Sequence, residues 1–183
     1  MTSARAKSNG IVHEEIKPNI GSRILNAKQE LLSGKLADGI RELLEARGVL
    51  VFPEIGFSDE EQIAFTRTLG TFQAERQGTD IFKVTLDTKE NPYSAEYLKG
   101  SLYWHLDGTM NDVPILASLL TSKKLSSWGG NTGFCNTYAA YEQLDEQRKA
   151  ELEGLRVMHG AWASLSYYEP ETSLAKLKGM QSI

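Results

Sequence analysis

The stretch "YWHLDGTM", residues 103–110, places a histidine and an aspartate two positions apart between aromatic and apolar neighbours. In a β-strand, side chains at positions i and i+2 project from the same face, roughly 6 to 7 Å apart. His105 and Asp107 could therefore converge on one metal ion, with Gly108 allowing the chain to bend where the strand ends. A neutral nitrogen ligand and a carboxylate form two thirds of a facial metal triad. Such a pair also arises by chance, and the alternative interpretation is an exposed strand face.

Helix signals lie on both sides of this stretch. Three segments are predicted to be helical: 36–47, 59–69 and 145–155. Apolar residues recur at helical spacing in the first, and Gly48 supplies its stop. Ser58 and Glu61 have the spacing of a capping box at the start of the second, and Asp145 is the expected N-cap of the third.

Strand signals are short and concentrate in the later part of the chain. Runs of β-branched, aromatic and alternating apolar residues predict strands at 49–52, 80–87, 101–107, 114–125 and 156–162. Residues 1 to about 20 are interpreted as a loose N-terminal arm. Helices that come first and short strands that dominate later predict an α+β chain built around antiparallel sheet.

The bulk composition is that of a globular protein with a real core. The chain has 183 residues, 40% of them hydrophobic and 24% charged, with a formal net charge of −4. The acidic balance argues against nucleic-acid binding, and no apolar run approaches a membrane span. The start "MTSARAKSNGIVHEE" has no apolar stretch typical of a secretion signal, and the single Cys135 excludes an intramolecular disulfide. A cytoplasmic protein is expected.

A second block of interest is "GGNTGFCNTYAAYEQL", residues 129–144. Taken by itself, Gly129 and Gly130 predict a hairpin turn, and Thr132 is an ordinary strand threonine. The residues at helical spacing i, i+3 and i+6 are predicted to be core: Tyr138, Tyr141 and Leu144. This stripe carries no chemistry.

The remaining candidates are single residues. His159 lies in the apolar run "LRVMHGAW" and could be a missing metal ligand, although a histidine there is more often part of the core. Cys135 has no histidine near it in sequence, so a nucleophilic thiol has little support.

Three sequence blocks that follow one another along the chain are more informative together than each motif alone: "GVLVFPEIGFSDEEQIAFTRTLG", then "WHLDGTM", then "GGNTGFCNTYAAYEQLDEQRKAELEGLRVMH". Together they resemble the taurine dioxygenase and 2,4-D dioxygenase family of iron(II)- and 2-oxoglutarate-dependent oxygenases, over about residues 40–160. The resemblance implies a double-stranded β-helix (jelly-roll) fold with flanking helices. It implies two cofactors, Fe(2+) and the cosubstrate 2-oxoglutarate.

The resemblance also implies roles for individual residues. His105 and Asp107 match the first histidine and the carboxylate of the iron triad, and an intact carboxylate favours hydroxylation over halogenation. Thr132 matches the threonine that contacts 2-oxoglutarate. Ser101 stands where relatives often carry an asparagine that faces cosubstrate and substrate. Gln73 falls near a position that faces substrate.

The sequence departs from the family downstream of the last block. The third ligand, a histidine, and the arginine that grips the far carboxylate of 2-oxoglutarate lie well beyond this block in relatives. No histidine occurs after His159 and no arginine after Arg156. We therefore expect residues 21–183 to be the front part of a single jelly-roll domain, after an arm over 1–20. The chain is then either the front part of a longer protein or a natural truncation. The first is favoured, because a truncation would lack the C-terminal part of the jelly roll and leave its partner strands as unpaired edges, which folded proteins avoid.

The function implied is hydroxylation of a small, anionic organic substrate by dioxygen, with release of succinate and CO2. One alternative is a catalytically incomplete, truncated homologue that acts as a binding or assembly module. Another is a cupin-like metal enzyme without an oxoacid, against which the G-G-x-T block counts. Expected partners are the small-molecule substrate and dioxygen, with no nucleic acid and no membrane. Relatives are commonly dimers or tetramers, which allows a homo-oligomer.

Overall fold

The computed structural model describes residues 5–74, 80–91, 95–98, 103–109, 111–160 and 169–180. The chain divides into two compact units. The first unit comprises Met1–Ile81 and Ser122–Glu153, and the second comprises Phe82–Thr121 and Gly154–Ile183. Each unit is described by itself. No helix in the described ranges is both long and apolar enough to cross a membrane.

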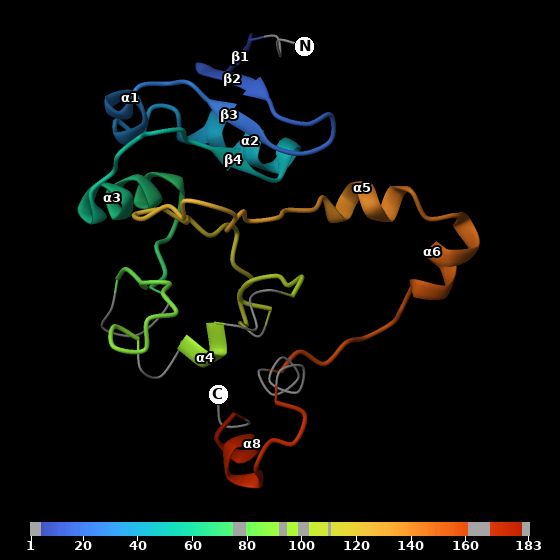
Figure 1. Cartoon of the computed structure of the whole chain (residues 1–183). Helices are drawn as coiled ribbons and strands as arrows, with labels where there is room; N and C mark the ends of the chain where they lie inside the picture. Colours follow the sequence, from blue (N-terminus) through green and yellow to red (C-terminus); the bar gives the residue numbers. More distant parts are fainter. Residues whose placement is uncertain are drawn as a thin grey trace. The chain divides into compact units, whose positions relative to one another are not determined.

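The first unit is built on a four-stranded sheet in the order β1-β2-β3-β4 (Figure 1). Its strands are β1 (Arg5–Ser8), β2 (Ile11–Glu15), β3 (Ser22–Ile24) and β4 (Leu50–Val51). The pairs β1–β2 and β2–β3 are antiparallel, whereas β3–β4 is parallel. Asn9 and Gly10 join β1 to β2 with φ angles of 45° and 83°. This is the positive-φ pair that a two-residue hairpin requires. The expected loose arm is therefore wrong for residues 5–15.

Three helices accompany the sheet: α1 (Lys28–Leu32), α2 (Ala37–Arg47) and α3 (Asp59–Leu69). The buried apolar side chains come from β2, β3, the three helices and the loop before α3: Ile11, Ile24, Leu31, Ile40, Leu43, Phe57 and Phe65. Helix α2 approaches the hairpin closely, because a Cβ on Gly39 would lie 2.9 Å from the carbonyl oxygen of Asn9 and 3.1 Å from the Ile11 side chain. The Phe65 ring meets those of Phe52 and Phe57 at 5.5 and 5.3 Å between centroids. One small core thus joins the sheet to its helices.

The ends of these helices agree with their local sequence signals. Helix α2 ends at Gly48, whose φ of 67° is left-handed. Helix α3 has the predicted bounds, and its capping box is formed by Ser58 and Glu61. A hydrogen bond from Lys28, with a second from the Ser58 backbone N–H, holds the pKa of the Glu61 carboxyl below its ordinary value. Both predicted helix limits are confirmed.

The later part of the first unit carries α5 (Thr137–Glu142) and α6 (Glu146–Leu152). Asp145 caps α6 as predicted, by accepting a hydrogen bond from the Arg148 N–H at 2.7 Å. The core stripe is wrong for its tyrosines, because Tyr138 and Tyr141 are 70% and 50% exposed. An i, i+3 pattern becomes core only where another element packs over it.

The second unit contains α4 (Ala95–Leu98) and α8 (Leu174–Met180). No strand occurs in the described parts of 80–87, 101–107, 114–125 and 156–162, so those four predictions are wrong there. The apolar residues that suggested strands are exposed, among them Val84, Leu86, Trp104, Leu106, Leu120 and Val157. A strand persists only when it pairs with a neighbour in a ladder, and the described parts of these segments form no such ladder.

The mixed sheet with helices confirms the predicted α+β class in its coarse form. The jelly roll and the boundary at residue 21 stay predictions.

Candidate metal-binding site

His105 and Asp107 lie in a turn of the second unit rather than in a strand. Their side chains nevertheless face one another, with 3.6 Å between His105 Nε2 and Asp107 Oδ1. Two donors each about 2.1 Å from one ion, at angles of about 90 to 120°, are themselves about 3.0 to 3.6 Å apart. Both side chains are about half exposed, at 51% and 57%, so an ion can reach them. The pair fits two adjacent positions of one metal ion.

The imidazole of His105 is oriented by its second nitrogen. Nδ1 lies 2.7 Å from the carbonyl oxygen of Tyr103. A carbonyl can only accept, so Nδ1 carries the proton, and the neutral form of this tautomer has its lone pair on Nε2, the atom that faces Asp107. Metal-ligating histidines commonly have such a partner, which fixes the tautomer and the ring orientation.

The carboxylate of Asp107 is oriented in the same manner. Its Oδ2 accepts a hydrogen bond from the Ser118 hydroxyl at 2.8 Å, while Oδ1 is the atom that faces His105. Each side chain of the pair therefore has one atom held by the protein and the other presented to the shared position. Sequence reasoning missed Ser118, because nothing in the sequence marks a serine 11 positions away as its partner.

Gly108 shapes the turn that presents the pair. Its φ is 65°, and the Asn111 N–H donates to its carbonyl at 3.0 Å. A Cβ at this position would lie 2.4 Å from Cδ1 of Ile115 and 3.0 Å from the Asn111 amide. Left-handed backbone and close approach both require glycine here. The predicted bend is present.

We expect Ser118→Ala to lower the affinity of the protein for Mn(II), a redox-inert probe, by about tenfold, because outer-shell partners typically contribute that much. Isothermal titration of wild type and variant in parallel measures the change. Ser126→Ala is the matched control, since Ser126 is also exposed but donates to a backbone oxygen, that of Trp128. Equal Mn(II) affinities for Ser118→Ala and wild type would show that the hydroxyl does not support the pair.

The part of the second unit that the structure describes shows no third ligand beside this pair. Within the described ranges, no group of three or more His, Cys, Asp and Glu side chains is placed to hold a metal ion. His159 is exposed and lies outside any strand, so its interpretation as a core histidine is wrong. The two donors therefore supply two of the three protein ligands that a facial triad requires.

The other predicted site residues belong to the other unit or lie outside the described residues. Thr132 and Gln73 are exposed and lie in the first unit, whereas His105 and Asp107 lie in the second. Ser101 falls outside the described residues. The roles of all five residues stay predictions.

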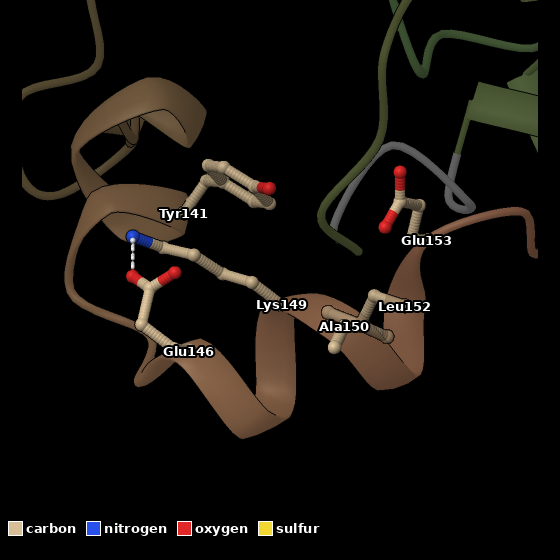
Figure 2. A pocket seen from close by; sticks show the side chains of 6 residues that line it. All are labelled: Tyr141, Glu146, Lys149, Ala150, Leu152 and Glu153. Atoms are coloured by element: carbon tan, nitrogen blue, oxygen red, sulfur yellow. Dashed lines mark hydrogen bonds and ion pairs between the residues drawn. The ribbon is translucent and has the colours of Figure 1, made fainter.

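A separate pocket of about 340 Å³ lies between α5 and α6 (Figure 2). Lys149 reaches from α6 to the ring of Tyr141, 5.5 Å from its centroid, and pairs with Glu146 at 3.1 Å. Its ammonium is thus already engaged. These contacts join two short helices and give the pocket no chemistry of its own.

A histidine nitrogen and an aspartate oxygen oriented in one turn define a candidate site for a single divalent metal ion. The model of the family described as "Taurine catabolism dioxygenase TauD, TfdA family" matches residues 13–180. The chain belongs to this family, which confirms the resemblance inferred from the sequence.

Two curated relatives illustrate the match. The (S)-phenoxypropionate/alpha-ketoglutarate-dioxygenase of Sphingobium herbicidovorans is 34% identical over 132 residues, covering 69% of this chain and 45% of the relative. The alpha-ketoglutarate-dependent 2,4-dichlorophenoxyacetate dioxygenase of Cupriavidus pinatubonensis is 31% identical over 149 residues, covering 73% and 52%. The chain thus spans about half the length of these relatives.

A solved structure supports the fold. The crystal structure of AAD-2 in complex with Mn(II) and N-oxalylglycine matches with a TM-score of 0.75 and 24% identity. The match covers 93% of this chain and 65% of that one. At this identity the likeness concerns the fold alone.

Proposed function

We propose that the chain is the metal-binding front part of an Fe(II)- and 2-oxoglutarate-dependent dioxygenase of jelly-roll fold. It hydroxylates a small anionic substrate and releases succinate and CO2. The observation that carries this proposal is the convergence of His105 Nε2 and Asp107 Oδ1, each with an orienting partner, in a chain of this family.

When bound, iron with 2-oxoglutarate supplies the oxidising chemistry toward dioxygen and substrate. The residues of this chain would bind the metal and the cosubstrate and fix their orientation. His105 and Asp107 hold the metal, and the Ser118 hydroxyl fixes which carboxylate oxygen of Asp107 is offered. Thr132 donates a hydrogen bond to a carboxylate of the cosubstrate. Ser101 and Gln73 contribute to the cosubstrate and substrate surfaces.

The proposed substrate class comes from the relatives. The two curated enzymes are named for phenoxypropionate and 2,4-dichlorophenoxyacetate, which are aryloxy carboxylic acids. We propose an acid of this kind for this protein, and we retain the predicted cytoplasmic location and homo-oligomeric assembly as predictions.

The test of this function is anaerobic titration of Fe(II) into the protein with 2-oxoglutarate, monitored by the visible charge-transfer band. Succinate release is then measured with and without an aryloxy acid. A band and substrate-stimulated succinate support the proposal. Absence of the band from a product of this gene that is as long as its relatives would contradict it.

We expect Thr132→Ala to weaken 2-oxoglutarate more than it weakens the metal. A hydrogen bond from a hydroxyl to a charged carboxylate contributes roughly 1.5 to 3 kcal/mol, which corresponds to about tenfold to a hundredfold in affinity. Titration of 2-oxoglutarate into the metal-loaded protein, beside titration of the metal alone, separates the two. A loss of metal affinity without a change for 2-oxoglutarate would make Thr132 a structural residue.

The second candidate is a catalytically incomplete homologue that acts as a binding or assembly module. It is favoured by one observation, that the described residues assemble two metal donors and no third. The intact mass of the natural protein, or its full reading frame, discriminates. A downstream histidine and arginine in the family arrangement would decide for the enzyme.

A further inference from the structure

Asn136 makes two contacts with the two ends of its amide. Its Oδ1 accepts a hydrogen bond from the Ala139 N–H at 3.0 Å and so caps α5. Its Nδ2 donates to the carbonyl oxygen of Asn19 at 2.6 Å. The first contact is local, whereas the second joins residues 117 positions apart. An N-cap needs only the side-chain oxygen, so the contact of Nδ2 with Asn19 is additional to the capping of α5.

The loop that receives this contact is itself held. It connects β2 to β3, and the Arg47 guanidinium donates to three of its carbonyls: those of Lys17, of Pro18 at 2.9 Å and of Gly21 at 3.1 Å. The planar fork of an arginine suits such multiple contacts. The Gly21 N–H in turn donates to the Arg47 carbonyl at 2.9 Å. Asn19 therefore offers a fixed acceptor on the body of the first unit.

The segment before Asn136 has a second attachment at its other end. The Lys123 ammonium pairs with Asp59 at 2.8 Å and donates to the Phe57 carbonyl at 3.3 Å, at the start of α3. Between Lys123 and Asn136 the chain has no regular structure (Figure 1). This irregular segment, residues 123–136, contains Thr132, and it is fastened to the first unit near both ends.

We propose that Asn136 is a positioning residue for Thr132. By joining the end of the segment to the Arg47-held loop, it fixes where the Thr132 hydroxyl is presented. Gly129 and Gly130, with φ angles of 66° and 74°, precede that hydroxyl and would leave it mobile without an anchor. The inference rests on the proposed function, because the ligand that Thr132 meets is 2-oxoglutarate.

The test separates the link from the cap. Asn136→Asp keeps a good N-cap oxygen but removes the donor to Asn19. Asn136→Ala removes both. Asn19→Ala leaves the backbone acceptor in place, and Asp145→Ala removes a cap from α6 that has no such link. All four variants are made in the full-length protein and compared with wild type in two measurements: backbone 15N order parameters without ligand, and affinity for 2-oxoglutarate and for Mn(II).

We expect Asn136→Asp to lower the order parameters of residues 129–135 from about 0.85, typical of a rigid backbone, to below about 0.6, while those of α5 keep their wild-type values. It should weaken 2-oxoglutarate by about twofold to tenfold, as loss of one neutral hydrogen bond predicts, with Mn(II) affinity unchanged. Asn136→Ala should match it in 2-oxoglutarate affinity, and Asn19→Ala and Asp145→Ala should match wild type.

Three results would contradict the proposal in different ways. Unchanged order parameters in Asn136→Asp overturn the link, whatever the ligand measurements show. Lowered order parameters with wild-type affinity for 2-oxoglutarate overturn the positioning role. A full-length wild-type protein that takes up no 2-oxoglutarate overturns the proposed function and, with it, this role of Asn136, while the order parameters still decide whether the link exists.

Discussion

In the full-length protein, replacing His105 or Asp107 with alanine is expected to abolish iron binding while both units keep their folds. Each substitution removes one of the two donors that face each other at 3.6 Å. The loss should exceed about a hundredfold in affinity, since outer-shell partners alone are worth up to that much. Neither side chain belongs to the core, so the free energy of unfolding should change little. Anaerobic Fe(II) titration with 2-oxoglutarate, monitored by the charge-transfer band, measures the loss.

The matched control is His159→Ala. His159 is also exposed and lies in the same unit, yet it is not grouped with the pair in the described residues. We expect this variant to retain the band. A band of normal intensity in His105→Ala or Asp107→Ala would rule the pair out as ligands.

The second large effect concerns the 183 residues expressed alone, which we expect to make no succinate and to hold iron weakly. The facial triad needs three ligands, and no histidine occurs after His159. A bidentate arginine contact to the distal carboxylate would be replaced poorly by a lysine such as Lys176 or Lys178. Lys176 is moreover already paired with Glu169.

A protein that contains these residues and has the full length of the relatives should release succinate and bind iron tightly. Succinate release is measured from the two proteins side by side, with His105→Ala in the longer one as the inactive reference. Stoichiometric succinate from the 183-residue chain would mean that its site is complete, with His159 as the third ligand.

The helices were predictable because their signals are local. The capping box at Ser58 and the left-handed Gly48 each act within one turn, so α2 and α3 end where the sequence indicates. The N-terminal hairpin carries a local signal too, the Asn9-Gly10 pair, but its flanking strands are too polar to show a clear alternation. The polar composition therefore suggested an arm where the chain forms a hairpin.

The strands after residue 80 could not be predicted in the same way. Alternation at Val84 and Leu86 indicates a strand, but pairing depends on a neighbour that can lie far along the chain. The proximity of His105 and Asp107 was predicted from strand geometry, yet the structure brings Nε2 and Oδ1 together through a turn at Gly108, and their metal role stays a prediction. The two-residue spacing of His105 and Asp107 thus correctly indicated that their side chains lie close together, although they lie in a turn and not in the predicted strand. The role of Ser118 could be identified only from the structure, because Ser118 lies in an irregular segment whose path the sequence does not indicate.

The loop held by Arg47 has a practical consequence for spectroscopy. Its contacts run through backbone carbonyls, so the side chain of Asn19 stays exposed and uninvolved in them. A cysteine introduced at position 19 could therefore carry a spin label or a fluorophore without disturbing the segment that it reports on. The natural Cys135 is exposed as well and would have to be replaced first. A label at position 19 and a second within the irregular segment would then track the approach of the two in solution.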